Sequence, residues 1–167
     1  MHPLIRRLND EWAILDPHPV PPAWRGSESL SGTTLIGDLP ATIRHSPDPV
    51  LGALLAVSEQ RALAHRVVMQ AMLGRVILDA GRDRCHGVED YLGELWLVIA
   101  SYPLERRPRS IAANIALDTR KRVVGRRVPE VSVERDHLSA TQEPPVEHEV
   151  EDLLRYARRA AILDPTS

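Results

Sequence analysis

Phenylalanine is absent from this 167-residue chain, and aromatic residues together make up only 4% of it. A core must therefore be built from Leu, Ile, Val and Ala, which suits packed helices better than a β-sandwich. The single cysteine, Cys85, excludes an internal disulfide. No stretch approaches the roughly 20 apolar residues that a membrane helix needs, and no secretory signal is visible at the start. We therefore expect a cytoplasmic protein with no membrane partner.

Charge is nearly balanced over the whole chain, at −2, but it is unevenly distributed. Residues 106–127 contain eight Arg or Lys against one acid, a net charge of +7. Residues 130–152 contain eight acids against one Arg, a net charge of −7. The basic block predicts a polyanionic partner, and the acidic block beside it could moderate that attraction.

The chain divides into four segments by composition. Residues 1–47 contain the proline-rich "DPHPVPPAW" and a Ser-, Gly- and Thr-rich stretch, which predict an irregular N-terminal arm. Residues 48–127 carry apolar residues at helical spacing and form the expected helical domain. Residues 128–145 are polar and proline-bounded, which is typical of an acidic linker. Residues 146–167 contain an expected C-terminal amphipathic helix.

Helix boundary signals support an all-α fold for the central segment. Asp48 is a good N-cap and Pro49 a good first helical residue. Ser110 is a plausible N-cap for a later helix that stops at Gly125. Apolar spacing predicts four helices, over about 49–57, 59–80, 88–102 and 111–124.

Motifs for catalysis or metal binding are not found in the sequence. It has no Gly-rich phosphate loop, no HExxH, no paired Cys/His spacing and no GxSxG elbow. Asp90 and Glu94 lie four residues apart, so they share one side of a helix, but nothing completes a catalytic site around them. We therefore expect no enzymatic activity, no cofactor and no metal.

The basic block surrounds the stretch "RSIAANIALDTRKR". Arg120, Lys121 and Arg122 fall in the last turn of the expected helix, where cations interact favourably with the helix dipole. That reason does not extend to the arginines before and after the helix. Cations on both sides of one short helix favour contact with a phosphate backbone.

Together, "VEDYLGELWLVIAS" and "RSIAANIALDTRKR" resemble region two of bacterial sigma factors, the subunits that direct RNA polymerase to promoters. The likeness covers about residues 50–127 and is greatest to the extracytoplasmic-function type. In that family an acidic helix binds the clamp helices of the largest polymerase subunit, and a second helix faces the promoter −10 element. The resemblance implies polymerase contacts by Asp90, Glu94 and Trp96. The residues that it and the charge pattern predict to bind DNA are Arg106, Arg107, Arg109, Asn114, Asp118, Arg120, Lys121 and Arg122.

Three departures from the family keep other interpretations open. Gly93 stands where the family usually has Gln, and the segment "PLERRPRS" lacks the aromatics that help open DNA. One expected helix follows the linker, where the family has region four with a helix-turn-helix. A sigma-like regulatory or phage-type protein without initiation activity, bound to polymerase or another regulator, is one alternative. A helical protein–protein interaction module is another. The acidic segment could also fold back onto the basic helix, or it could be an ordinary solvated linker.

Overall fold

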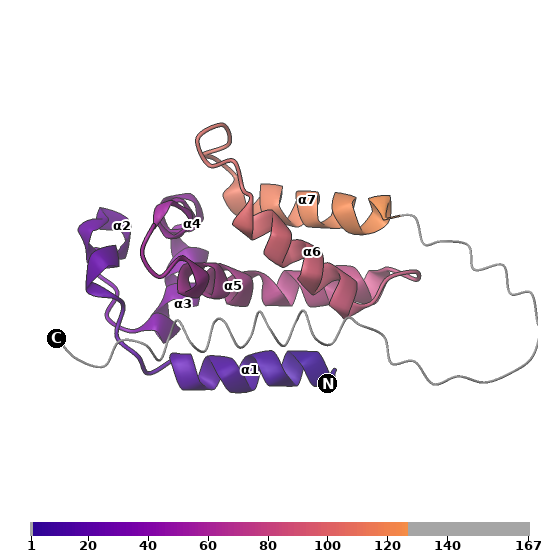
Figure 1. The fold of residues 1–167 in the computed structure, drawn as a ribbon, viewed down its shortest axis with the longest axis horizontal. Helices are drawn as coiled ribbons and strands as arrows, with labels where there is room; N and C mark the ends of the chain where they lie inside the picture. Colours follow the sequence, from indigo (N-terminus) through magenta and orange to yellow (C-terminus); the bar gives the residue numbers. More distant parts are fainter. Residues whose placement is uncertain (1, 127–167) are drawn as a thin grey trace, which may run out of the picture.

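The structure, a computed structural model, describes residues 2–126. Within this range it contains helices and no strand, apart from an isolated bridge between Pro19 and Leu35. The all-α prediction of a small helical bundle is therefore confirmed (Figure 1). The expected linker 128–145 and C-terminal helix 146–167 lie outside the described residues. The elements are α1 (Pro3–Leu15), η1 (Pro22–Gly26), α2 (Glu28–Ser31), η2 (Ile36–Asp38), α3 (Leu39–His45), α4 (Pro47–Ala56), α5 (Arg61–Arg82), α6 (Val88–Ala100) and α7 (Ile111–Gly125).

Helix α5 is the longest helix within residues 2–126 and lies at the centre of the bundle. It packs against α3, α4, α6 and α7, and in Figure 1 it runs between α1 and the α6–α7 pair. Its residues 63–69 are all buried, and beyond them Met72, Val76 and Ala80 are buried at helical spacing. The predicted helices 49–57 and 59–80 correspond to α4 and α5, with boundaries shifted by one to two residues.

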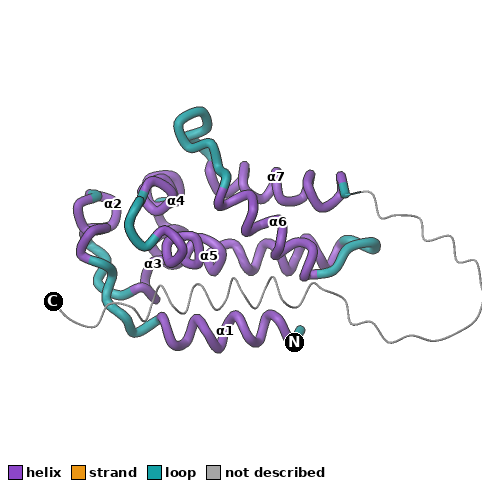
Figure 2. Tube along the Cα trace, in the orientation of Figure 1, coloured by secondary structure: helices purple, strands orange, loops and turns teal. Residues whose placement is uncertain are grey.

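Helices α6 and α7 form a hairpin joined by residues 101–110. The joining loop projects from one end of the hairpin (Figure 2), and α7 then returns along α6. Ile111, Ile115 and Val123 are fully buried on the inner side of α7, and Leu95 and Ile99 are buried on α6. The predicted helices 88–102 and 111–124 are therefore confirmed in position.

The N-terminal 47 residues are not an irregular arm, and this prediction was wrong. They contain α1, α2 and α3, and side chains from this range lie in the same core as α5 and α6. Trp24 is 1% exposed, and its indole Nε1–H donates to the carbonyl of Glu59 at 3.2 Å. Val20, from the proline-rich stretch, is fully buried. The prolines here separate short helices, and the apolar residues between them pack into the core.

Arg66 fixes α1 against α5. Its guanidinium is buried, donates to the carbonyl of Leu8 at 2.7 Å, and lies 5.5 Å from the centre of the Trp12 ring. Burial lowers the pKa of Arg66 to about 10, so it stays charged at neutral pH. The spacing of Ile5, Leu8 and Trp12 is that of an amphipathic helix, a signal in the sequence that the proline-rich surroundings obscured.

None of the helices within residues 2–126 is both long and apolar enough to cross a membrane.

Candidate nucleic-acid interface

The start of α7 is held by a side chain from α4. Ser110 adopts a left-handed conformation, with φ of 52°, and its own side chain makes no capping hydrogen bond. The carboxylate of Asp48 instead accepts the backbone N–H groups of Ser110 at 2.7 Å and Ile111 at 2.8 Å. An acid suits the positive end of a helix dipole. The predicted cap for α4 is thus a cap for α7, since α4 begins one residue before Asp48, at Pro47.

The loop that enters α7 is fixed by its own side chains. The Tyr102 hydroxyl donates to the carbonyl of Arg107 at 2.8 Å, and the Arg107 guanidinium lies 5.8 Å from the Tyr102 ring centre. The Asn114 amide donates to the Tyr102 hydroxyl at 3.2 Å and to the Arg109 carbonyl at 2.9 Å. Arg107 also pairs with Asp118 on α7.

Three of the predicted DNA contacts therefore act inside the protein. Asn114, Asp118 and Arg107 connect the loop to α7, so their polar groups position the loop. Tyr102 and Asp48 belong to the same arrangement, and sequence reasoning assigned a role in this interface to neither. A signal for Tyr102 was present, because it is the sole aromatic residue in the loop.

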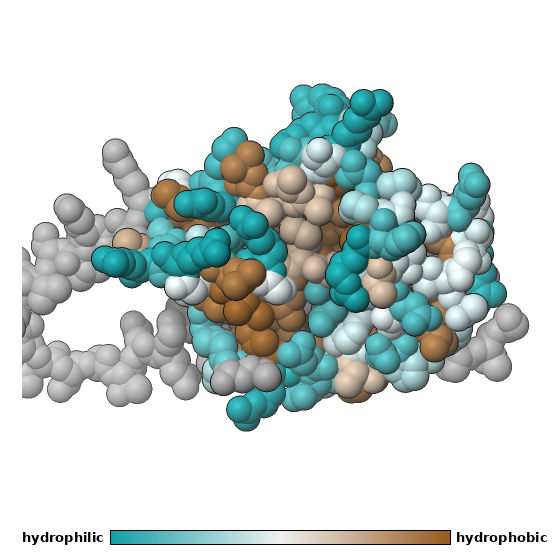
Figure 3. All heavy atoms as spheres, turned by 180° about the vertical axis from the view of Figure 1, so that it is seen from behind, coloured by the Kyte–Doolittle hydropathy of each residue, from teal (hydrophilic) through white to brown (hydrophobic). Residues whose placement is uncertain are grey.

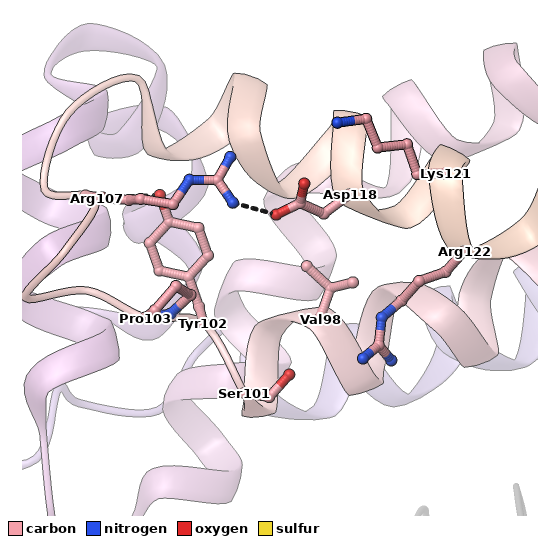
Figure 4. Close-up of a pocket in the computed structure, with 8 residues that line it drawn as sticks. All are labelled: Val98, Ser101, Tyr102, Pro103, Arg107, Asp118, Lys121 and Arg122. Carbon is pink, nitrogen blue, oxygen red and sulfur yellow. Dashed lines mark hydrogen bonds and ion pairs between the residues drawn. The ribbon is translucent and has the colours of Figure 1, made fainter.

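A hollow of about 290 Å³ opens between the loop, the end of α6 and α7. Figure 4 shows Arg107 paired with Asp118 on one side, and Arg122 extending from α7 toward α6. Lys121 and Arg122 leave α7 in different directions, and Tyr102 forms part of the wall. Arg107 pairs with Asp118 and Arg122 pairs with Glu94, so among residues 2–126 Lys121 is the lining cation without a carboxylate partner. Its charge suits an anionic group such as a phosphate.

Glu94 is buried against α7, so it does not form an exposed acidic face with Asp90. Its side chain is 8% exposed, and its carboxylate lies 3.5 Å from Arg122 and 3.4 Å from Arg126. Asp90 is half-buried and accepts the backbone N–H of Gly87 at 2.9 Å, at the start of α6. The expectation of a shared docking face is corrected: four-residue spacing aligned the two acids, but α7 covers the second.

The outer face of α6 runs along Glu89, Gly93 and Leu97, which are exposed. Leu97 is 50% exposed. Asp90 and Trp96 lie on opposite sides of this face, because an α-helix has 3.6 residues per turn. Trp96 is half-buried, and its ring packs edge-on against His65 at a centroid distance of 6.0 Å.

Five of the predicted DNA-binding cations are exposed, and one of them, Arg122, pairs with Glu94. Among residues 2–126, none of the other four has a carboxylate within ion-pair distance. Two lie in the loop and two in the last turns of α7, and of the four Lys121 lines the hollow. They are Arg106, Arg109, Arg120 and Lys121.

A second polar cluster lies at the turn between α5 and α6. The Asp83 carboxylate accepts the backbone N–H of Cys85 at 2.8 Å and the Tyr91 hydroxyl at 3.0 Å, and lies 3.1 Å from His86 Nδ1. Backbone donation from Cys85, with the Tyr91 and His86 contacts, lowers the pKa of Asp83 to about 2. Burial and Asp83 raise the pKa of Tyr91 to about 12. The cluster stabilises the turn, and sequence reasoning missed it.

In the part of the chain that the structure describes, no three His, Cys, Asp or Glu side chains lie close enough together to hold a metal ion.

Comparison of the chain with protein-family models, with curated proteins and with solved structures finds no match.

Proposed function

We propose that the chain is a sigma-like transcription protein whose α6–α7 hairpin binds the phosphate backbone of promoter DNA. The observation that carries the proposal is the loop held by Asp48, Asn114 and Asp118, which presents Arg106 and Arg109 without a carboxylate partner in residues 2–126. A fixed loop loses little conformational entropy when it binds, so its cations contribute more of their interaction energy to affinity. The resemblance to sigma region two supplies the class of partner.

Polymerase binding is the second part of this proposal and rests on the resemblance. The surface that would meet the clamp helices is the outer face of α6, around Leu97, with Asp90 and Trp96 on its flanks. Glu94 would act indirectly, by holding Arg122 and Arg126 against α6. Such a protein would work in the cytoplasm, beside the polymerase.

One observation favours the regulatory alternative, a sigma-like protein that binds without opening DNA. Tyr102 is the loop's sole aromatic, and its hydroxyl is bonded to Arg107 while the Arg107 guanidinium lies over its ring. A base could stack on the face of the ring that Arg107 covers only after Arg107 moved. Phosphate contacts need no such movement, so binding and strand opening are separable here.

The direct test is fluorescence anisotropy of the full chain with a labelled DNA duplex, and with one strand alone, over a series of salt concentrations. Several phosphate contacts predict that the logarithm of affinity falls linearly and steeply with the logarithm of salt. A flat response, or no binding at low salt, would exclude the DNA part of the proposal.

A pull-down with core polymerase, followed by promoter-dependent transcription, separates the remaining alternatives. Binding together with transcription supports a sigma-like initiator, and binding without transcription supports the regulatory form. Failure to bind either DNA or polymerase would favour a helical interaction module that is unrelated to transcription.

A further inference from the structure

The outer side of α7 exposes an apolar stripe among cations. Leu117 is 48% exposed and Val124 is 59% exposed, and their seven-residue spacing puts them on the same side of the helix. Arg120 and Lys121 lie between them in sequence and are also exposed. Figure 3, which views the molecule from behind, shows apolar patches bordered by hydrophilic residues on its surface. A surface that is both apolar and basic fits an amphipathic, acidic partner.

The chain itself contains a segment with those properties. Residues 130–152 carry a net charge of −7, against +6 for residues 106–126 of the hairpin. From Val146 onward, in part within the same range, apolar residues recur at helical spacing; they are Val146, Val150, Leu153, Leu154, Ala157 and Ala161. Because residues 127–167 continue directly from α7, tethering gives this segment an effective concentration of roughly millimolar at the surface. A free acidic partner would have to compete with that concentration.

We infer that residues 130–161 dock on the outer side of α7, with acids against Arg120 and Lys121 and apolar side chains against Leu117 and Val124. This docking stands on the α7 surface and on charge complementarity, and it does not require nucleic-acid binding. Its regulatory consequence does rest on the proposed function: the segment would compete with DNA for the same cations. DNA affinity would then be set by how readily the segment is displaced.

Paramagnetic broadening in the full chain tests the docking directly. Cys85→Ser removes the single cysteine, which is exposed, and Arg159→Cys, outside the apolar stripe, gives one site for a nitroxide label. At low salt, the amide signals of Leu117 to Val124 should lose most of their intensity, and they should regain it when the nitroxide is reduced. High salt should weaken the effect, because it screens exposed charges.

Two variants in the labelled chain serve as controls. Neutralising the acids with Glu147→Gln, Glu149→Gln and Glu151→Gln should restore the α7 signals. The double variant Leu117→Ser, Val124→Ser should also restore the α7 signals. Here the signals are measured at the amides of Arg120 and Lys121, which the substitutions leave in place. Unchanged signal dispersion in the rest of the spectrum would show that each variant remains folded.

Other outcomes would overturn the inference. Undiminished α7 signals in the labelled chain would exclude docking on this surface. Broadening that appears only when labelled chains are mixed with isotopically enriched, unlabelled chains would assign the surface to a second copy. DNA added to the labelled chain separates this inference from the proposed function. If DNA also fails to bind the Glu147→Gln, Glu149→Gln, Glu151→Gln variant, in which the segment no longer covers α7, while the broadening persists in the labelled chain without these changes, docking stands and the nucleic-acid proposal falls.

Discussion

The carboxylate of Asp48 accepts the backbone N–H groups of Ser110 and Ile111 across more than sixty residues of sequence. The two helix-boundary signals in the sequence, Asp48 for α4 and Ser110 for α7, thereby combine into one long-range cap. Ser110 cannot serve as a conventional N-cap, because its left-handed backbone differs from the extended conformation that such a cap adopts. The start of α7, and the basic loop before it, are consequently tied to α4.

Replacing Asp48 should therefore destabilise the α6–α7 hairpin. Asp48→Ala leaves two helix N–H groups without their acceptor, and we expect it to lower the free energy of unfolding by about 1–2 kcal/mol. Asp48→Asn keeps one acceptor oxygen and loses the charge, so its effect should be smaller. Urea unfolding followed by circular dichroism measures both, with Asp10→Ala on the exposed side of α1 as the control. Equal stability of Asp48→Ala and Asp10→Ala would contradict the cap.

Trp24 tests whether the N-terminal segment belongs to the core. Its side chain is 1% exposed, so we expect Trp24→Ala to cost about 3–5 kcal/mol of unfolding free energy, through lost burial and the cavity left behind. Trp24→Phe retains most of the ring volume and loses the hydrogen bond to Glu59, and it should cost less. The measurement is the urea midpoint of the single cooperative transition. A separate early transition for residues 2–46 would show instead that this segment unfolds independently.

The helices between residues 47 and 125 were predictable from sequence because their apolar residues recur at helical spacing over long segments. The hydrogen-bond and ion-pair partners of individual side chains could not be predicted from sequence, because they depend on how the helices pack. Spacing put Asp90 and Glu94 on one side of α6, but only the position of α7 buries Glu94. Asn114 and Asp118 have the polarity expected of DNA contacts, and they bind the loop because residues 103–109 fold back beside α7.

Glu94 and Arg122 should be energetically coupled. Because Glu94 is buried and Arg122 is about half exposed, a double-mutant cycle with Glu94→Gln and Arg122→Gln should give a coupling energy of about 0.5–1 kcal/mol. Lys121→Gln is a matched control, because Lys121 is adjacent, exposed and without a carboxylate partner in residues 2–126. Its cycle with Glu94→Gln should give a value near zero. Equal couplings for the two cycles would indicate a general charge effect and no specific pair.

Stability should fall at alkaline pH because of Tyr91. Its pKa is raised to about 12 in the folded protein, against about 10 in an unfolded chain. The stability that comes from the protonated hydroxyl is therefore complete below about pH 10 and is lost as the pH rises toward 12. Urea midpoints at neutral and alkaline pH should fall less for Tyr91→Phe than for the original chain. Tyr102→Phe, which removes a different tyrosine hydroxyl, should keep the original dependence.

The lowered pKa of Asp83 predicts that the protein also loses stability at acid pH. The pKa is about 2 in the folded protein and about 4 in the unfolded chain, so the stability that the ionised carboxylate contributes is present above pH 4 and is lost as the pH falls toward 2. Asp83→Asn should have a lower urea midpoint at neutral pH and should lose less of it between pH 4 and 2. Parallel curves for the variant and the original chain would rule out this carboxylate as a source of acid sensitivity.

Substitution of Arg106 and Arg109 tests whether the loop contacts phosphates of DNA. Both are exposed and lie in the loop fixed by Tyr102 and Asp118, so each is placed to neutralise one phosphate. Arg106→Gln with Arg109→Gln should weaken DNA binding and reduce the slope of log affinity against log salt by about 2, since each phosphate contact contributes about 0.9 on duplex DNA.

The matched control for that pair is Arg25→Gln with Arg44→Gln, which changes net charge equally on η1 and α3. If α6, α7 and their loop are the binding site, this control should leave the salt slope almost unchanged. Equal losses from both pairs would show that net charge governs binding, and the loop would then have no special role. An unchanged slope in the loop variant would place the phosphate contacts elsewhere on the protein. Only a reduced slope confined to the loop variant supports an interface centred on Arg106 and Arg109.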